Sequence, residues 1–87
     1  MNIHNLVADS FKVAGLDPDK YTVSVVKRNS LIFLTIRHKT VRRFMTIDIG
    51  VEGSLVTDVV VMENTLLEGE PYTAFMDTFE AAEYIYV

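Results

Sequence analysis

Apolar and polar residues follow a helical spacing at the start of the chain. Asn2 can serve as an N-cap, and Gly15 followed by Asp17–Pro18 supplies a stop signal. The apolar residues between these signals recur every three or four positions, at Ile3, Leu6, Val7, Phe11 and Ala14. The pattern therefore predicts an amphipathic helix over about 3–14.

From Tyr21 the spacing changes to two, which is typical of strands. Four segments with this spacing, 21–25, 31–37, 42–49 and 55–61, are separated by polar or glycine-containing turns at 27–30, 37–40 and 50–54. Short turns favour pairing between consecutive strands, so the pattern predicts a four-stranded antiparallel β-meander. The segment 31–37 is apolar on both faces, which indicates either a strand covered on both sides or one whose second face is a binding patch.

The last segment allows two interpretations. In the first, Pro71 opens a long helix whose apolar stripe has helical spacing, at Tyr72, Phe75, Met76, Phe79 and Ala82. In the second, 72–76 is extended and a shorter helix begins after Asp77, whose spacing to Glu80 fits a capping box. We favour the long helix, since it places all these apolar residues on one face.

Together these elements predict an α+β fold with an N-terminal helix, a four-stranded antiparallel β-meander and a C-terminal helix. The 87 residues are 49% hydrophobic, enough for one core, and we expect a single domain over 1–87. Cysteine is absent, which excludes disulfides and thiolate metal sites. The N-terminus resembles neither a signal peptide nor a membrane span, so we expect a cytoplasmic protein without membrane contact.

Candidate chemistry is sparse. His4 and His38 have no metal-ligand spacing, the serines lie in no nucleophile motif, and the glycines form no phosphate-binding loop. We therefore expect no catalytic residues, no metal site and no cofactor, and predict that the protein is not an enzyme.

Charge is strongly segregated along the chain. All eight Lys and Arg residues lie within 1–43, whereas nine of the twelve acidic residues lie within 44–87. The basic cluster in the 37–43 hairpin could contact phosphates through Arg37, Lys39, Arg42 and Arg43. The acidic remainder of the chain would oppose a polyanion, so we regard nucleic-acid binding as the alternative function.

The acidic C-terminal third is the other candidate surface. Its carboxylates alternate with tyrosines and have no Lys or Arg beside them. Tyrosines can anchor a protein interface, and carboxylates steer it toward a basic partner. The residues we assign to this partner-binding face are Tyr72, Glu80, Glu83, Tyr84 and Tyr86.

Several segments are similar to small phage-encoded anti-CRISPR and other anti-defence proteins, in particular an acidic Cas9 inhibitor. They are Met1–Ile3 with Leu6, the strand start at 21–23, and 31–37, so the likeness covers roughly the first 37 residues and needs a gap. The resemblance implies a leading helix, a short antiparallel sheet and a non-enzymatic inhibitor. The chain differs in its basic hairpin and its more modest acidic tail, and no functional residue is carried over.

The leading hypothesis is a non-catalytic protein-binding module, a phage or mobile-element inhibitor of a host defence complex, that covers a basic surface with its acidic, tyrosine-bearing face. A nucleic-acid-binding module using the 37–43 hairpin is one alternative. A homo-oligomeric structural protein is another, because segregated charges can be self-complementary.

Overall fold

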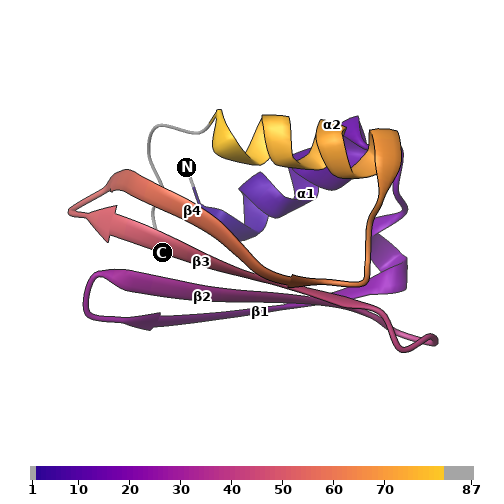
Figure 1. Cartoon of the computed structure of the whole chain (residues 1–87), viewed down its shortest axis with the longest axis horizontal. Coiled ribbons are helices and arrows are strands. Elements are labelled where there is room, and N and C mark those ends of the chain that lie inside the picture. Colours follow the sequence, from indigo (N-terminus) through magenta and orange to yellow (C-terminus); the bar gives the residue numbers. More distant parts are fainter. Residues whose placement is uncertain (1, 82–87) are drawn as a thin grey trace.

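The computed structural model describes residues 2–81 and has two layers, with both helices on one face of a four-stranded sheet (Figure 1). The elements in chain order are α1 (Ile3–Val13), a 3₁₀ turn η1 (Pro18–Lys20), β1 (Tyr21–Arg28), β2 (Leu31–His38), β3 (Phe44–Glu52), β4 (Leu55–Asn64) and α2 (Gly69–Glu80). The strand order β1-β2-β3-β4 is an antiparallel meander. The α+β fold expected from the sequence is confirmed.

Helix α1 begins and ends where its sequence indicates. The Asn2 side chain caps the helix, its Oδ1 accepting from the backbone N–H of His4 at 2.7 Å. Gly15 follows the helix with a φ of 73°, a left-handed conformation that favours glycine. The buried face contains Ile3, Leu6, Val7 and Phe11, as the helical spacing predicts.

The two outer hairpins turn within two residues. Asn29 and Gly53, the first residue of each turn, have φ angles of 55° and 64°, the region that tight hairpin turns require. The first strand therefore runs to Arg28, beyond the predicted end at residue 25.

Strand β3 is shifted relative to its predicted bounds. It runs over 44–52, whereas the sequence pattern predicted 42–49, and Gly50 and Val51 belong to the strand and not to a turn. The pairing of β3 with β4 is irregular between Gly50 and Val51, which leaves Thr57 as an extra residue on β4. A Cβ at Gly50 would lie 2.8 Å from the Thr57 Oγ1, so glycine here accommodates the bulge and does not mark a turn.

The long-helix interpretation of the C-terminal segment is confirmed. Helix α2 spans Gly69–Glu80, two residues longer at its start than predicted, and buries Phe75, Met76 and Phe79. Ala82, the last residue of the predicted stripe, lies outside the described residues. The alternative, an extended 72–76, is wrong.

The core lies between the helices and the inward face of the sheet. A line of aromatic rings runs through it, with centroid separations of 4.8 Å for Phe11–Tyr21, 5.5 Å for Phe11–Phe75 and 5.9 Å for Phe75–Phe79. This line joins β1, α1 and α2. Below it, β2 and β3 contribute fully buried apolar side chains at Ile32, Leu34, Ile36, Met45, Ile47 and Ile49.

The loop between β4 and α2 turns the chain from the sheet to the helix layer. The Asn64 Oδ1 accepts from the backbone N–H groups of Leu66 and Leu67 at 3.0 and 3.1 Å, and its Nδ2 donates to the Leu67 carbonyl at 2.8 Å. Thr65 fixes the same loop to the start of β3, with backbone and hydroxyl bonds to Phe44. These bonds set where α2 begins.

We expect Asn64→Ala to lower the free energy of unfolding by about 1–3 kcal/mol, because it removes three hydrogen bonds and leaves their backbone partners unsatisfied. Urea unfolding followed by circular dichroism measures the change. Asn5→Ala, an exposed site on α1, is the control and should change stability by less than about 0.5 kcal/mol. Equal effects of the two substitutions would contradict the role given to Asn64.

Candidate interaction surfaces

The structure describes two of the five residues of the predicted acidic, tyrosine-bearing face. Tyr72 is half-buried and packs against the core, while Glu80 is exposed at the end of α2. Glu83, Tyr84 and Tyr86 lie outside the described residues. Of the face proposed from sequence, the structure therefore places Glu80 in solvent and assigns Tyr72 a packing role.

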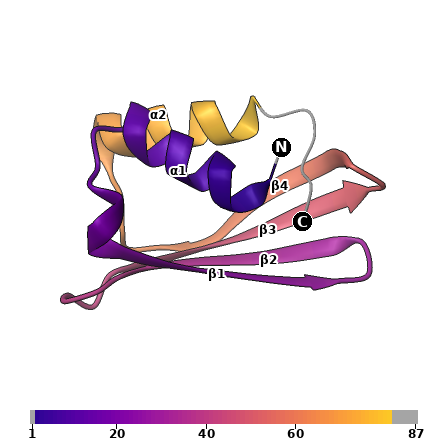
Figure 2. The same ribbon diagram turned by 180° about the vertical axis from the view of Figure 1, so that it is seen from behind.

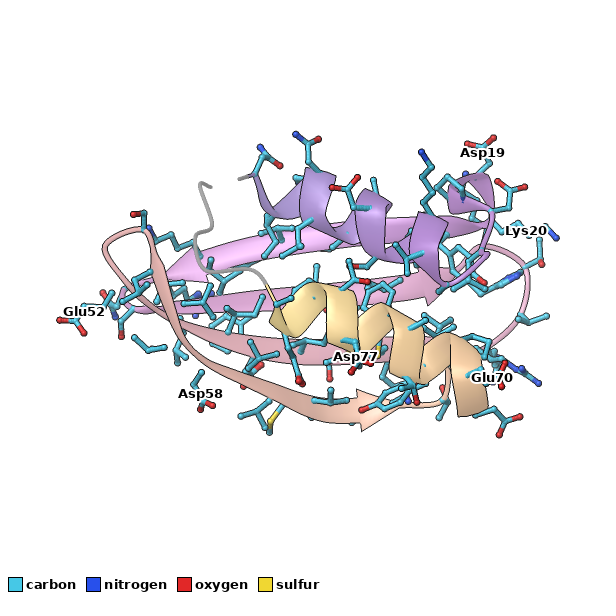
Figure 3. All side chains as sticks on the ribbon, turned by 90° about the horizontal axis from the view of Figure 1, so that it is seen from above. Asp19, Lys20, Glu52, Asp58, Glu70 and Asp77 are labelled. Atoms are coloured by element: carbon cyan, nitrogen blue, oxygen red, sulfur yellow. The ribbon has the colours of Figure 1, made fainter. Side chains whose placement is uncertain are left out.

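Helix α2 nevertheless has an acidic solvent side. Glu70, Asp77 and Glu80 are all exposed, and we call these three residues the acidic helix face. Figure 3 shows that α2 lies over β3 and β4, whereas α1 lies over the other half of the sheet. Glu80 lines the same shallow hollow as Asp58 of β4, so the acidic region continues from the helix layer to the sheet edge.

The basic residues of the 37–43 segment gather at one end of the sheet. Arg37, Arg42 and Arg43 line one hollow together with Phe44, and the Arg37 guanidinium carbon lies 5.2 Å from the centre of the Phe44 ring, a cation–π distance. Lys39 lies in a separate hollow with Asp19 and Lys20. The structure thus brings together three of the four candidate phosphate contacts.

His38 has a structural role that its sequence context did not reveal. It is half-buried, and its ring meets Tyr21 edge-on at a centroid distance of 5.2 Å. Its Nδ1 lies 3.2 Å from the Thr40 backbone N–H, which donates to it. The backbone N–H of Lys39 donates to the Lys20 carbonyl at 2.9 Å, so the basic loop is held against the residue that precedes β1.

The outward face of the sheet is a surface that sequence reasoning raised only as one possibility for 31–37. Within residues 2–81, no helix covers it, as the view from behind in Figure 2 shows. The face can be described as four rows of side chains that follow the strand pairing and run from β1 to β4. We call it the open face.

One of these rows is mainly apolar, and each of the other three contains at most one apolar side chain. In the register of the strands the rows are Arg28–Leu31–Gly50–Asp58, Val26–Phe33–Asp48–Val60, Ser24–Thr35–Thr46–Glu63 and Thr22–Arg37–Phe44, and the pair Glu52–Leu55 extends the face at the turn between β3 and β4. Val26, Leu31 and Val60 are exposed at 46%, 41% and 41%. Such neighbouring exposed apolar side chains are a feature of interaction surfaces.

Charge on the open face is divided between its two halves. The β1–β2 half has Arg28 and Arg37, whereas the β3–β4 half has only acids, at Asp48, Glu52, Asp58 and Glu63. The segregation seen along the sequence is therefore preserved in space.

Other kinds of site find little support. Among residues 2–81, no three His, Asp or Glu side chains are grouped to hold a metal ion. The same part of the chain contains no helix that is long and apolar enough to cross a membrane. The buried hydroxyl of Ser10 donates to the Leu6 carbonyl at 2.8 Å and so belongs to the helix packing.

Comparison with protein-family models, with curated proteins and with solved structures gave no match.

We expect Tyr72→Ala to lower the free energy of unfolding by about 1–2 kcal/mol, because it removes a half-buried ring from the core. Glu80→Gln should leave stability within about 0.5 kcal/mol of the wild type, since its side chain is exposed. Denaturant unfolding measures both. Unchanged stability of the Tyr72 variant would contradict its packing role and would favour the role in partner binding that the sequence predicted.

Proposed function

We propose that the protein is a non-catalytic protein-binding module whose acidic helix face docks on a basic surface of a partner. The observation that carries the proposal is the position of the acids. Residues 44–81 contain eight acidic residues and no Lys or Arg, and they fold into adjacent elements, β3, β4 and α2. This half of the molecule consequently has an excess of negative charge, which Arg42 and Arg43 offset locally at Glu68, in the hollow that these three residues line.

Physical chemistry favours recognition of a basic surface by such a region. Uniform charge over several elements raises the rate of encounter with a partner of opposite sign and disfavours partners of like sign. On α2 the three acids project from a helix whose opposite side is fixed by Phe75, Met76 and Phe79. Their backbone is therefore held in place before binding, which lowers the entropic cost of association.

The partner class we propose is a host defence complex with a basic surface, and the protein would inhibit it by covering that surface. The small size, the net charge of −4 and the resemblance of the first 37 residues to anti-defence proteins support this class. Many basic protein surfaces bind nucleic acid, so occupation by an acidic domain is a direct means of competition.

A nucleic-acid-binding function is the second candidate, and the pairing of Arg37 with Phe44 favours it. A guanidinium beside an aromatic ring, with Arg42 and Arg43 nearby, could hold a phosphate and a stacked base. The acids on the same face, including Asp48 and Glu63, would repel the adjoining phosphates. We rank this function second for that reason.

We expect the double variant Asp77→Lys/Glu80→Lys to lose its partner, because it reverses charge on the acidic helix face while leaving the buried side of α2 intact. Loss of at least about tenfold in recovered partner is expected for charges central to the contact. The measurement is affinity capture from nuclease-treated extract of the source cells, with partners identified by mass spectrometry.

The matched control is Asp9→Lys/Asp19→Lys, which makes the same change in net charge at exposed sites on α1 and η1. It should retain the partner. Equal loss in both variants would show that only net charge matters, and equal retention would contradict the proposed face. Recovery of a partner solely without nuclease, and its loss at raised salt, would favour the basic 37–43 segment instead.

A further inference from the structure

We propose that the open face is a homodimer interface on which a second copy of the chain packs sheet against sheet. The two-fold axis would run parallel to the strands, so that β1 of one copy lies over β4 of the other. This inference goes beyond the proposed function, because it uses the side of the sheet away from the helices and leaves the acidic helix face free (Figure 1).

The apolar content of the open face is the first support. Val26, Leu31 and Val60 keep 46%, 41% and 41% of their surface in water, and the half-buried Phe33 lies between Val26 and Asp48 in the same row. Removing these side chains from water would favour association. A second sheet is the flat, pleated partner that fits such a surface, as in β-sandwiches.

The size of the face is sufficient. Strands spaced by about 4.8 Å, with a rise of about 3.3 Å per residue, give four strands of eight residues a flat area of about 500 Å². Strands β1 and β2 have that length, and β3 and β4 are longer. Two copies together would cover about 1,000 Å² of flat area, near the lower size of specific interfaces.

Charge complementarity identifies the occupant as a second copy in one particular orientation. An axis parallel to the strands reverses the order of the strands but keeps each row opposite itself. In the outermost row, Arg28 then lies over the partner's Asp58, and the same contact is repeated at the other side of the axis. In the same row Leu31 lies over the partner's Gly50, beside which the Thr57 side chain packs.

The remaining rows are also compatible. Val26 lies over the partner's Val60, and Arg37 lies over the partner's Phe44, which repeats between copies the cation–π pair already formed within each copy. Thr35 and Thr46 meet near the axis, where their short side chains do not obstruct the approach of the two sheets. The basic half of each open face is thus opposite the acidic half of the other.

The alternative two-fold axis, perpendicular to the strands, is disfavoured by the same charges. It would place β4 over β4 with the order of the rows reversed, so that the acidic β3–β4 half of one copy would face the acidic half of the other. Like charges in contact across an interface cost free energy and select against such an arrangement. The distribution of charge on the open face therefore favours the two-fold axis parallel to the strands.

Asp48 limits the strength of the dimer. It is half-buried between Phe33 and Val60, and a second sheet would remove more water from its carboxylate. Desolvation of a carboxylate opposes association. We therefore expect reversible association, and a variant with a neutral side chain, Asp48→Asn, should dimerise more tightly than the wild type.

The test exploits the distance between Arg28 and Asp58 within one copy. These residues lie on the two edge strands, three strand spacings or about 14 Å apart, so they do not pair within the monomer. Arg28→Glu and Asp58→Arg should each weaken the homodimer about tenfold or more, because each places like charges opposite one another twice. Sedimentation velocity over a concentration series measures the association.

Mixing the two variants provides the decisive step. A dimer of one Arg28→Glu copy and one Asp58→Arg copy restores opposite charges at both positions, so the mixture should associate about as tightly as the wild type. Each variant alone should keep the wild-type thermal midpoint, since both sites are exposed. Restored association of the mixture would support the proposal, because reassociation through another surface would not depend on these two charges.

Three results would overturn the inference: a wild type that stays monomeric throughout the series, single variants that dimerise as tightly as the wild type, or a mixture that stays dissociated. None of these depends on capture of a partner by the acidic helix face, so failure here and failure of the proposed function are distinguishable.

Discussion

One-sided coverage of the sheet is the constraint on which the rest of the structure depends. Both helices lie on the same face, held there by the aromatic line from Tyr21 through Phe11 and Phe75 to Phe79. Helices α1 and α2 also pack against each other, and together they bury the inward side chains of the two central strands. The outward face must then face water or a partner, and its partly apolar rows are what make a partner the better explanation.

The same arrangement keeps the two kinds of charge apart. A meander places consecutive strands side by side, so charge that is segregated along the chain remains segregated across the sheet. Helix α2 returns over β3 and β4 and adds acids to the half that already has them (Figure 3). The molecule therefore has a basic end near Arg42 and Arg43 and an acidic helix face. The two halves of its open face carry charges of opposite sign. Both proposals rest on this division.

Local signals predicted the elements well. The two ends of α1 were predictable because the Asn2 cap and the left-handed Gly15 depend only on neighbouring residues. The alternation in 31–37 likewise identified Ile32, Leu34 and Ile36 as one face of the strand. The predicted end of β3 was wrong because the glycine signal at Gly50 is ambiguous. That glycine faces the bulge at Thr57, a contact with the neighbouring strand that a single sequence does not reveal.

The surfaces were less predictable, for a related reason. Whether a tyrosine such as Tyr72 packs in the core or lies on the surface depends on how its helix packs against the sheet. Likewise, whether the second face of β2 is covered depends on the placement of both helices, which no local pattern encodes. The row that joins Arg28 to Asp58 across four strands exists only once the register of all three strand pairs is set.

The most direct test of one-sided coverage is the reactivity of single cysteines in β2, since the chain has none of its own. Thr35→Cys and Ile36→Cys place a thiol on opposite faces of the same strand, and their reaction with a thiol reagent would be timed in dilute native protein. If only the inward face is covered, residue 35 should be labelled rapidly and residue 36 should be protected until the protein unfolds. Equal protection at both positions in the monomer would show that the outward face is covered too and would contradict one-sided coverage.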